Sequence, residues 1–172
     1  LLRGGDVARD HRRLAAIVSL DVAGYSRLMG MDDSGTLATL KAHRRELIDP
    51  TIAEHDGRIV KTTGDGLLLE FSSVVDAVRC AVDLQRGMAE RNEGIVPDQR
   101  LDFRIGVNVG DIIIDGDDIF GDGVNVAARL QEQGRDGDVV VGESTHRLVS
   151  ARVTLELLGS FALKGRSEAV KA

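Results

Sequence analysis

A tight turn between two apolar runs constrains the fold of this chain more than any other feature of its sequence. Gly64-Asp65-Gly66 separates Arg58–Thr62 from Leu67–Phe71. Two such runs joined by a short glycine-containing turn predict an antiparallel β-hairpin. Asp65 would then stand at the tip of the hairpin, where its carboxylate is held rigidly and can still reach solvent.

The apolar patterns before the hairpin predict one strand and one long helix. Leu14–Leu20 is an unbroken apolar run and is expected to be a strand buried on both faces. Asp33-Ser34 offers an N-cap for the helix that follows, and Gly57 ends it. Pro50 lies inside this pattern and should kink or divide the helix.

After the hairpin the sequence predicts, in order, a helix from about Val74 to Arg91, a strand at Leu101–Val109, a turn at Gly110-Asp111 into a strand at Ile112–Ile114, an acidic loop at Asp115–Asp118, a helix at Val124–Gln133, a strand at Val139–Val141, a short helix at Ser144–Val149, and strands at Val153–Leu158 and Phe161–Leu163. This order indicates one α+β domain, with helices on one face of an antiparallel sheet. A ferredoxin-like βαββαβ core with additional C-terminal strands is the natural candidate. Residues 1–12 are polar and charged and are expected to be a tether, so that the domain covers residues 13–172.

Composition excludes several classes of function. The chain has 172 residues, 42% of them apolar, which fits one globular domain. Its net charge of −6, with both signs interspersed, argues against a nucleic-acid-binding protein. No run approaches the roughly 18 apolar residues of a membrane span. The lone Cys80 rules out an internal disulfide and fits a reducing, cytoplasmic compartment. The first residue is Leu1 rather than methionine, and we expect the chain to be a piece of a longer polypeptide.

Two aspartates, Asp21 and Asp65, each follow an apolar run. Either one alone is more simply read as a turn former or a helix cap. If they converge, with no histidine or cysteine beside them, they would suit Mg²⁺ or Mn²⁺ better than zinc. The pair therefore suggests a metal site.

A second polar pair, Asn125 and Arg129, is spaced by four residues and should project from one side of the predicted helix. A solvated arginine with a local partner is the simpler interpretation. The functional interpretation is a guanidinium for a phosphate and an amide for a sugar oxygen. The preceding Gly121-Asp122-Gly123 would let the backbone approach a ligand closely. Neither a Walker loop nor a Rossmann fingerprint occurs.

Three segments together resemble the catalytic domain of the class III nucleotidyl cyclases. They are Leu20-Asp21-Val22-Ala23-Gly24-Tyr25-Ser26, Lys61-Thr62-Thr63-Gly64-Asp65-Gly66, and Phe120-Gly121-Asp122-Gly123-Val124-Asn125-Val126-Ala127-Ala128-Arg129-Leu130. Leu163-Lys164-Gly165 is similar to the closing motif of that family. The resemblance covers about residues 13–170.

The resemblance implies a role for each matching residue. Asp21 and Asp65, with the backbone carbonyl of Val22, would bind two divalent cations, Mg²⁺ or Mn²⁺. Asn125 would orient the ribose, and Arg129 would stabilise charge on the α-phosphate. Lys164 would meet the distal phosphates. The implied reaction is attack of the ribose 3′-hydroxyl on the α-phosphate, with release of pyrophosphate.

The resemblance also bears on substrate and assembly. Lys61 and Asp118 match the base-selecting pair of the family, and lysine with aspartate favours ATP over GTP. The family builds shared sites in a homodimer, in which one protomer would supply the aspartates and its partner the remaining residues. An attached regulatory domain is also expected. The alternatives are a non-catalytic nucleotide-binding or dimerising module, and a diguanylate cyclase or polymerase palm. The chain lacks the Gly-Gly-Asp/Glu-Glu-Phe hairpin of diguanylate cyclases.

Overall fold

A computed structural model describes residues 11–151, 160–162 and 169–171 of the chain. Its elements follow in the order β1 (His11–Ala23), α1 (Tyr25–Met31), α2 (Asp33–His43), a π-helical segment (Arg44–Ile48), α3 (Asp49–Glu54), β2 (Arg58–Thr63), β3 (Gly66–Phe71), α4 (Val74–Arg91), a 3₁₀ turn (Pro97–Gln99), β4 (Asp102–Asp115), β5 (Asp118–Phe120), α5 (Asp122–Gln133), β6 (Val139–Val141), α6 (Glu143–Val149), β7 (Ser160–Ala162) and β8 (Ala169–Lys171).

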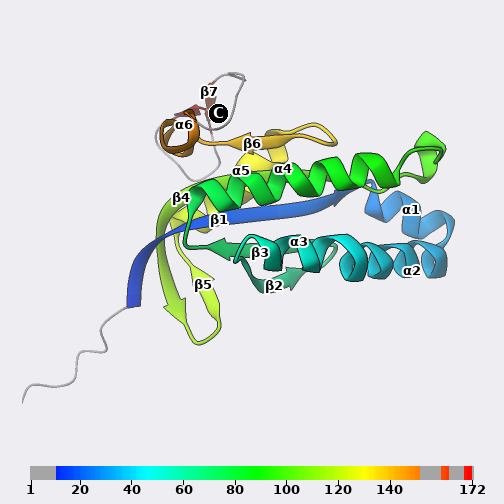
Figure 1. Ribbon diagram of the computed structural model, residues 1–172, viewed down its shortest axis with the longest axis horizontal. Coiled ribbons are helices and arrows are strands. Elements are labelled where there is room, and N and C mark those ends of the chain that lie inside the picture. The colour runs from blue at the N-terminus through cyan, green and yellow to red at the C-terminus, as the bar shows by residue number, and fades with distance from the viewer. Residues whose placement is uncertain (1–10, 152–159, 163–168, 172) are drawn as a thin grey trace, which may run out of the picture.

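The main sheet has the strand order β2-β3-β1-β4-β5, and β6 joins it by pairing with β4 (Figure 1). All of these pairings are antiparallel except that of β6 with β4. The first four strands have the order of a split βαβ unit, which confirms the predicted α+β fold of ferredoxin type. β1 begins at His11, inside the segment expected to be a tether. β7 and β8 form a separate two-stranded sheet, and the strand predicted at Val153–Leu158 lies outside the described residues.

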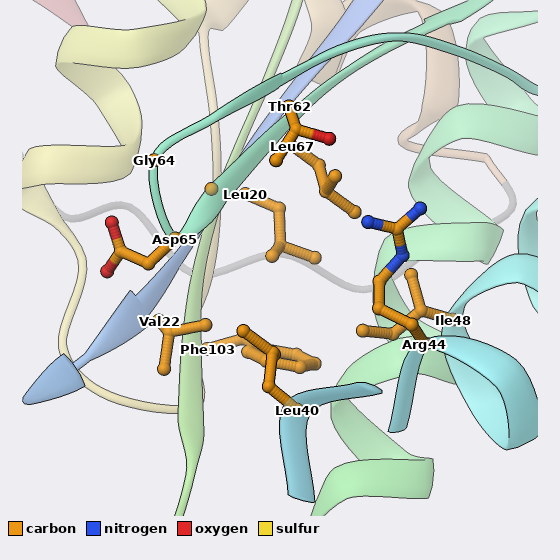
Figure 2. A pocket seen from close by; sticks show the side chains of 11 residues that line it. Leu20, Val22, Leu40, Arg44, Ile48, Thr62, Gly64, Asp65, Leu67 and Phe103 are labelled. Carbon is orange, nitrogen blue, oxygen red and sulfur yellow. The ribbon is translucent and has the colours of Figure 1, made fainter. Parts of the chain in front are cut away.

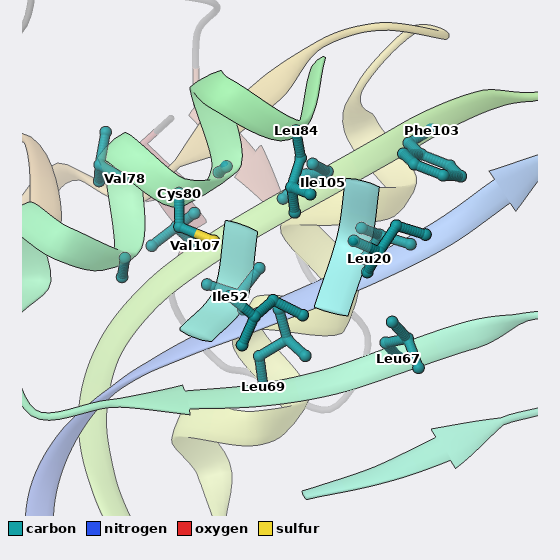
Figure 3. Close-up of a cluster of buried hydrophobic side chains, with 14 of the residues drawn as sticks. Leu20, Ile52, Leu67, Leu69, Val78, Cys80, Leu84, Phe103, Ile105 and Val107 are labelled. Atoms are coloured by element: carbon teal, nitrogen blue, oxygen red, sulfur yellow. The ribbon is translucent and has the colours of Figure 1, made fainter. Parts of the chain in front are cut away.

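One face of the sheet is covered by α4 and by the helices between β1 and β2. Figure 3 shows this core, in which Leu20 of β1, Leu69 of β3 and Ile105 of β4 meet Leu84 of α4 and Ile52 of α3. These five side chains are almost completely buried. Burial of a leucine or isoleucine contributes about 1.5–3 kcal/mol relative to exposure, so this layer holds the strands that carry the site.

Helix α5 packs on the opposite face, so the expectation that the helices lie on one face is wrong for α5. Ala15 and Ile17 alternate with the core residues of β1 and pack with Ala127 of α5. Gly106 of β4 makes this contact possible, because a Cβ there would lie 2.3 Å from the carbonyl oxygen of Ala127. The sequence shows a glycine inside a strand, but it does not show which helix approaches it.

The turn predicted at Gly110-Asp111 is also wrong, because β4 continues through both residues. Gly110 pairs with Ala15 of β1, and Asp111 pairs with Leu14. A Cβ on Gly110 would lie 3.0 Å from the Cα of Gly123 at the start of α5. This glycine therefore serves close packing between a helix and the sheet rather than a reversal of the chain.

The long helix predicted before the hairpin is divided, as expected near Pro50. α2 passes into the π-helical segment, and α3 follows with Pro50 in its first turn. The N-cap is Asp32 rather than Asp33-Ser34, because the Asp32 carboxylate accepts a hydrogen bond from the Gly35 backbone nitrogen at 2.9 Å. In the described part of the chain, none of the helices has the length and hydropathy that crossing a membrane requires.

Candidate active site

The structure brings Asp21 and Asp65 together at one end of the sheet. The pairing between β1 and β3 ends at Leu20 and Leu67. Asp21 is the next residue after Leu20, and Asp65 comes two residues before Leu67, so both aspartates lie just beyond this end of the pairing. Gly66 allows the hairpin to come this close, because a Cβ at this position would lie 2.6 Å from the carbonyl oxygen of Leu20. Gly64 completes the turn with a φ of 64°.

Arg104 is a third member of this cluster, and the sequence analysis missed it. It stands opposite Asp21 in the pairing of β1 with β4, and its Nη2 donates to Asp21 Oδ2 at 2.9 Å. Both side chains are about a third exposed. The alternation along Leu101–Val109 places Arg104 among the polar positions of its strand. Its partner, however, depends on strand register, which the sequence does not give.

The two carboxylates repel each other where they meet. Burial raises the pKa of Asp65, and the neighbouring charge of Asp21 raises it further, while a backbone hydrogen bond and the positive charge of Arg104 oppose the shift. A divalent cation would favour the charged form of Asp65 and so offset this raised pKa. Cysteine and histidine ligands are absent from this cluster, so its donor set fits Mg²⁺ or Mn²⁺.

The metal site would depend partly on groups other than these side chains. Among the described residues, no three histidine, cysteine or acidic side chains gather in an arrangement that could hold a metal ion. The side chain of Val22 is buried in the core at 2% exposure, so only its backbone carbonyl could contribute. Two carboxylates and one carbonyl leave coordination positions for the oxygens of a substrate.

A small pocket lies between the hairpin and the helices, on the side of Arg44 (Figure 2). Its walls are mainly apolar and include Leu20, Leu40 and Phe103. Figure 2 shows the carboxylate of Asp65 pointing away from this pocket. Asp65 is nevertheless among the residues that line the pocket, so the pocket adjoins the carboxylate cluster.

Lys61 and Asp118 form a second group, in which Lys61 Nζ donates to Asp118 Oδ2 at 3.0 Å. They come from β2 and β5, the two ends of the strand order, so the sheet curls until these ends meet. The hydrogen bond from Lys61 lowers the pKa of Asp118. Lys61 also lies 5.3 Å from the centre of the Phe120 ring. Lysine and aspartate thus hold each other in place without a ligand.

Asn125 and Arg129 form a third group on α5. Asn125 is exposed, and Arg129 is 36% exposed and pairs with both carboxylate oxygens of Glu132 at 3.0 and 3.1 Å. The sheet-facing side of the helix is the one with Ala127. A Cβ on Gly123 would lie 3.2 Å from the Cα of Gly110, so this glycine serves close packing of α5 on the sheet. Its predicted role in approaching a ligand stays a prediction.

The three groups stay separate within one copy of the chain. Inside residues 11–151, no hydrogen bond or ion pair links the carboxylate cluster to the Lys61–Asp118 pair or to the polar pair on α5. Lys164 lies outside the described residues. Within the described residues of one copy, the three groups predicted for a nucleotide site therefore do not form a single cluster.

Comparison with known proteins shows the family to which the chain belongs. The family model described as "Adenylate and Guanylate cyclase catalytic domain" matches residues 8–171. A Rhizobium meliloti (strain 1021) protein named "Putative adenylate cyclase 3" is 44% identical over 149 residues, which cover 87% of this chain and 25% of that protein. The chain thus spans about a quarter of the length of this curated relative.

Solved structures show the same fold. An "Adenylate/Guanylate Cyclase/Hydrolase" from Silicibacter pomeroyi is 44% identical, has a TM-score of 0.88, and aligns over 94% of this chain and 95% of its own. The "adenylyl cyclase CyaB from P. aeruginosa" has a TM-score of 0.83 at 22% identity, over 94% of this chain and 92% of its own, and supports the fold alone.

Fold and motifs together define the class of protein as a nucleotidyl cyclase, a lyase. This chain belongs to the adenylate and guanylate cyclase catalytic domain family, which confirms the resemblance seen in the sequence.

Proposed function

We propose that this domain is an adenylate cyclase, which converts ATP to 3′,5′-cyclic AMP and pyrophosphate. The observation that carries the choice of ATP is the contact between Lys61 and Asp118. The name of the Rhizobium meliloti relative supports the same choice.

The chemistry of this pair favours adenine over guanine. Asp118 has a lowered pKa and is therefore a carboxylate that only accepts hydrogen bonds. Adenine presents an amine at position 6, which can donate to it, whereas guanine presents a carbonyl oxygen, which would repel it. Lys61 would donate to a ring nitrogen of the purine. A site built to accept a hydrogen bond rejects a base that cannot donate one.

Asp21 and Asp65, with the carbonyl of Val22, would hold two divalent cations, Mg²⁺ or Mn²⁺, whose chemistry is to acidify the ribose hydroxyl and neutralise the triphosphate. Arg104 beside Asp21 would offset part of the charge of the carboxylates. In the reaction the 3′-oxygen bonds to the α-phosphorus, the bond to the bridging oxygen breaks, pyrophosphate leaves, and the hydroxyl proton passes to solvent.

The remaining residues would orient the nucleotide. Arg129 would release Glu132 and place its guanidinium on the α-phosphate, where charge develops in the transition state. Asn125 would fix the ribose. Lys164 would bind the distal phosphates.

We further propose that two copies of the chain form a homodimer that shares these sites. One copy would supply the carboxylate cluster, and its partner would supply Lys61, Asp118, Asn125, Arg129 and Lys164. The separation of the three groups within one copy supports this arrangement. Because the relatives are longer, we also propose that further domains of the full protein regulate the activity.

Turnover of nucleotide tests the proposed reaction. The chain is incubated with Mn²⁺ and either ATP or GTP at several protein concentrations, and cyclic nucleotide and pyrophosphate are measured. We expect cyclic AMP, a preference for ATP, and specific activity that rises with protein concentration. An Asp21→Asn preparation controls for contaminating cyclases. Faster turnover of GTP would contradict the base assignment, and no product from either nucleotide would support a non-catalytic module.

Complementation tests the shared site. Asp65→Ala and Asn125→Ala should each be inactive alone, because each damages both sites of its own homodimer. A mixed dimer would contain one of its two sites without either substitution. Random one-to-one mixing makes about half of the dimers mixed, so it should restore about a quarter of the activity of the wild-type dimer. If cross-linking shows mixed dimers and no activity returns, the shared-site proposal is wrong.

A further inference from the structure

A buried carboxylate, Glu70, lies on β3, which is the neighbour of β2, the strand that carries Lys61. Its side chain is 4% exposed on β3, where its neighbour on β1 is the core residue Ile17. A buried charge is retained at low cost only when it is paired and hydrogen-bonded. Two arginines, Arg13 and Arg58, pair with it from the solvent side.

Arg58 connects this carboxylate to the far end of the sheet. Its Nη2 and Nε donate to Glu70 Oε2 at 2.6 and 3.1 Å, which fixes the plane of the guanidinium. Its Nη1 then donates to the carbonyl oxygen of Asp117 at 2.9 Å. Asp117 belongs to the two-residue turn that joins β4 to β5, and the next residue is Asp118.

A β-bulge in β2 places Arg58 and Lys61 on the same face of the sheet. Arg58 pairs with Glu70 and Ile59 with Leu69, but the register then shifts so that Lys61 pairs with Leu68. Residues three apart in a regular strand would point to opposite faces. The extra residue lets both cations face β5, and bulges are known to re-aim side chains in this way.

We infer that Glu70 and Arg58 are positioning residues for purine selection, because they clamp the β4–β5 turn and so hold Asp118 against Lys61. This inference rests on the proposed function. Glu70 fixes the fork of Arg58, Arg58 fixes the carbonyl of Asp117, and the turn then fixes the carboxylate that would accept from adenine. In the proposed site, neither residue would contact the nucleotide.

Arg13 provides a matched control for Arg58. The two side chains have nearly equal exposure, 42% and 43%, and both pair with Glu70. Only Arg58 reaches the β4–β5 turn. Arg58→Ala should therefore lower the melting temperature at least as much as Arg13→Ala, and only Arg58→Ala should loosen Asp118.

The test compares the steady-state kinetics of these variants with ATP and GTP. Arg58→Ala should raise the KM for ATP about 3- to 10-fold, the equivalent of one lost hydrogen bond, with kcat within about 2-fold. The ATP over GTP preference in kcat/KM should fall by a similar factor. Arg58→Lys cannot make the fork and should restore only part of the loss. Glu70→Gln keeps an acceptor and should show a smaller change in the same direction.

Hydrogen exchange of the backbone gives a second readout that needs no activity. Arg58→Ala should speed exchange at residues 115–119, and Arg13→Ala should not. If both variants change the KM and the exchange equally, or if Arg58→Ala changes neither, the clamp is wrong. If the wild-type chain turns over neither nucleotide, the proposed function fails, and exchange still decides whether the clamp exists.

Discussion

The carboxylate cluster and the Lys61–Asp118 pair differ in the sign of the charge that faces each aspartate. Asp21 and Asp65 are like charges in contact, and burial together with this repulsion raises the pKa of Asp65. Lys61 and Asp118 are opposite charges in contact, and the hydrogen bond lowers the pKa of Asp118. The structure thus disfavours one charged carboxylate and favours the other.

This difference indicates how each region meets its ligand. The Lys61–Asp118 pair is preorganised, because its geometry is already satisfied in the free protein. The carboxylate cluster carries a stability cost that a bound cation would remove. Proteins commonly accept such a cost where function needs it.

Asp65→Asn is expected to have the largest effect and to act in opposite directions on activity and stability. Turnover of ATP should fall by about 10²–10³-fold or more, because a metal ligand is lost. The melting temperature of the metal-free protein should rise, because the amide removes a charge that the fold disfavours. Calorimetry in a chelating buffer measures the second effect. A lower melting temperature would show that the carboxylates do not repel.

Arg129→Ala should lower kcat by about 10²–10³-fold, by analogy with loss of one transition-state donor. Among the described residues, its hydrogen bonds and its ion pair are with Glu132 three residues on, and such pairs contribute about 0.2–0.5 kcal/mol. Stability should therefore hardly change. Glu132→Ala is the matched control, since it breaks the same pair and should keep its activity. Equal losses in both variants would mean that the ion pair, rather than the arginine, matters.

Lys61→Met should reduce the preference for ATP over GTP about 10-fold, because it removes a donor to the purine and frees Asp118. The pair is more than a third exposed, and the change in melting temperature should be small. Parallel kinetics with the two nucleotides measure this effect. An unchanged preference for ATP over GTP would mean that Lys61 and Asp118 do not select the purine base.

The smallest expected effect is on the pH dependence of stability, which should differ in direction between the two regions. Asp65 has a raised pKa, so its contribution to stability is present below the ordinary value of 3.8 and is lost as the pH rises through its own pKa. Asp118 has a lowered pKa, so its contribution is present above 3.8 and is lost as the pH falls through its own pKa.

Melting curves from neutral to acid pH, without metal, measure both contributions. The advantage of Asp65→Asn over the wild-type protein should shrink as the pH falls. The disadvantage of Asp118→Asn should persist to a lower pH and then shrink. Parallel curves for the two variants would contradict the comparison.

Local signals in the sequence were sufficient for much of the fold. The hairpin around Asp65 follows from its turn residues, and α4 spans Val74–Arg91 as its apolar period predicts. The predicted division of the long helix falls near Pro50, where the π-helical segment passes into α3, because proline cannot donate within a helix. These features depend on residues close together in the chain.

Features that depend on strand register or on contacts between distant elements could not be predicted from local sequence signals. Arg104 meets Asp21 only because of the register between β1 and β4. Gly110 looked like a turn residue because nothing in the sequence shows that Gly123 packs on it. The bulge that re-aims Lys61 is likewise a property of two paired strands, and so is the Arg58–Glu70 contact.

Gly66 is a position at which even the smallest side chain would disturb the proposed metal-binding end of the sheet. Its missing side chain leaves room for the carbonyl oxygen of Leu20, a backbone atom that cannot swing aside. One added methyl group would clash with this oxygen and move the tip of the β2–β3 hairpin away from the end of β1. We therefore expect the Gly66→Ala variant to fold and to keep its preference for ATP over GTP in binding, but to lose cyclase activity. Such a variant would be a non-catalytic nucleotide-binding protein, of the kind that can serve as a regulator.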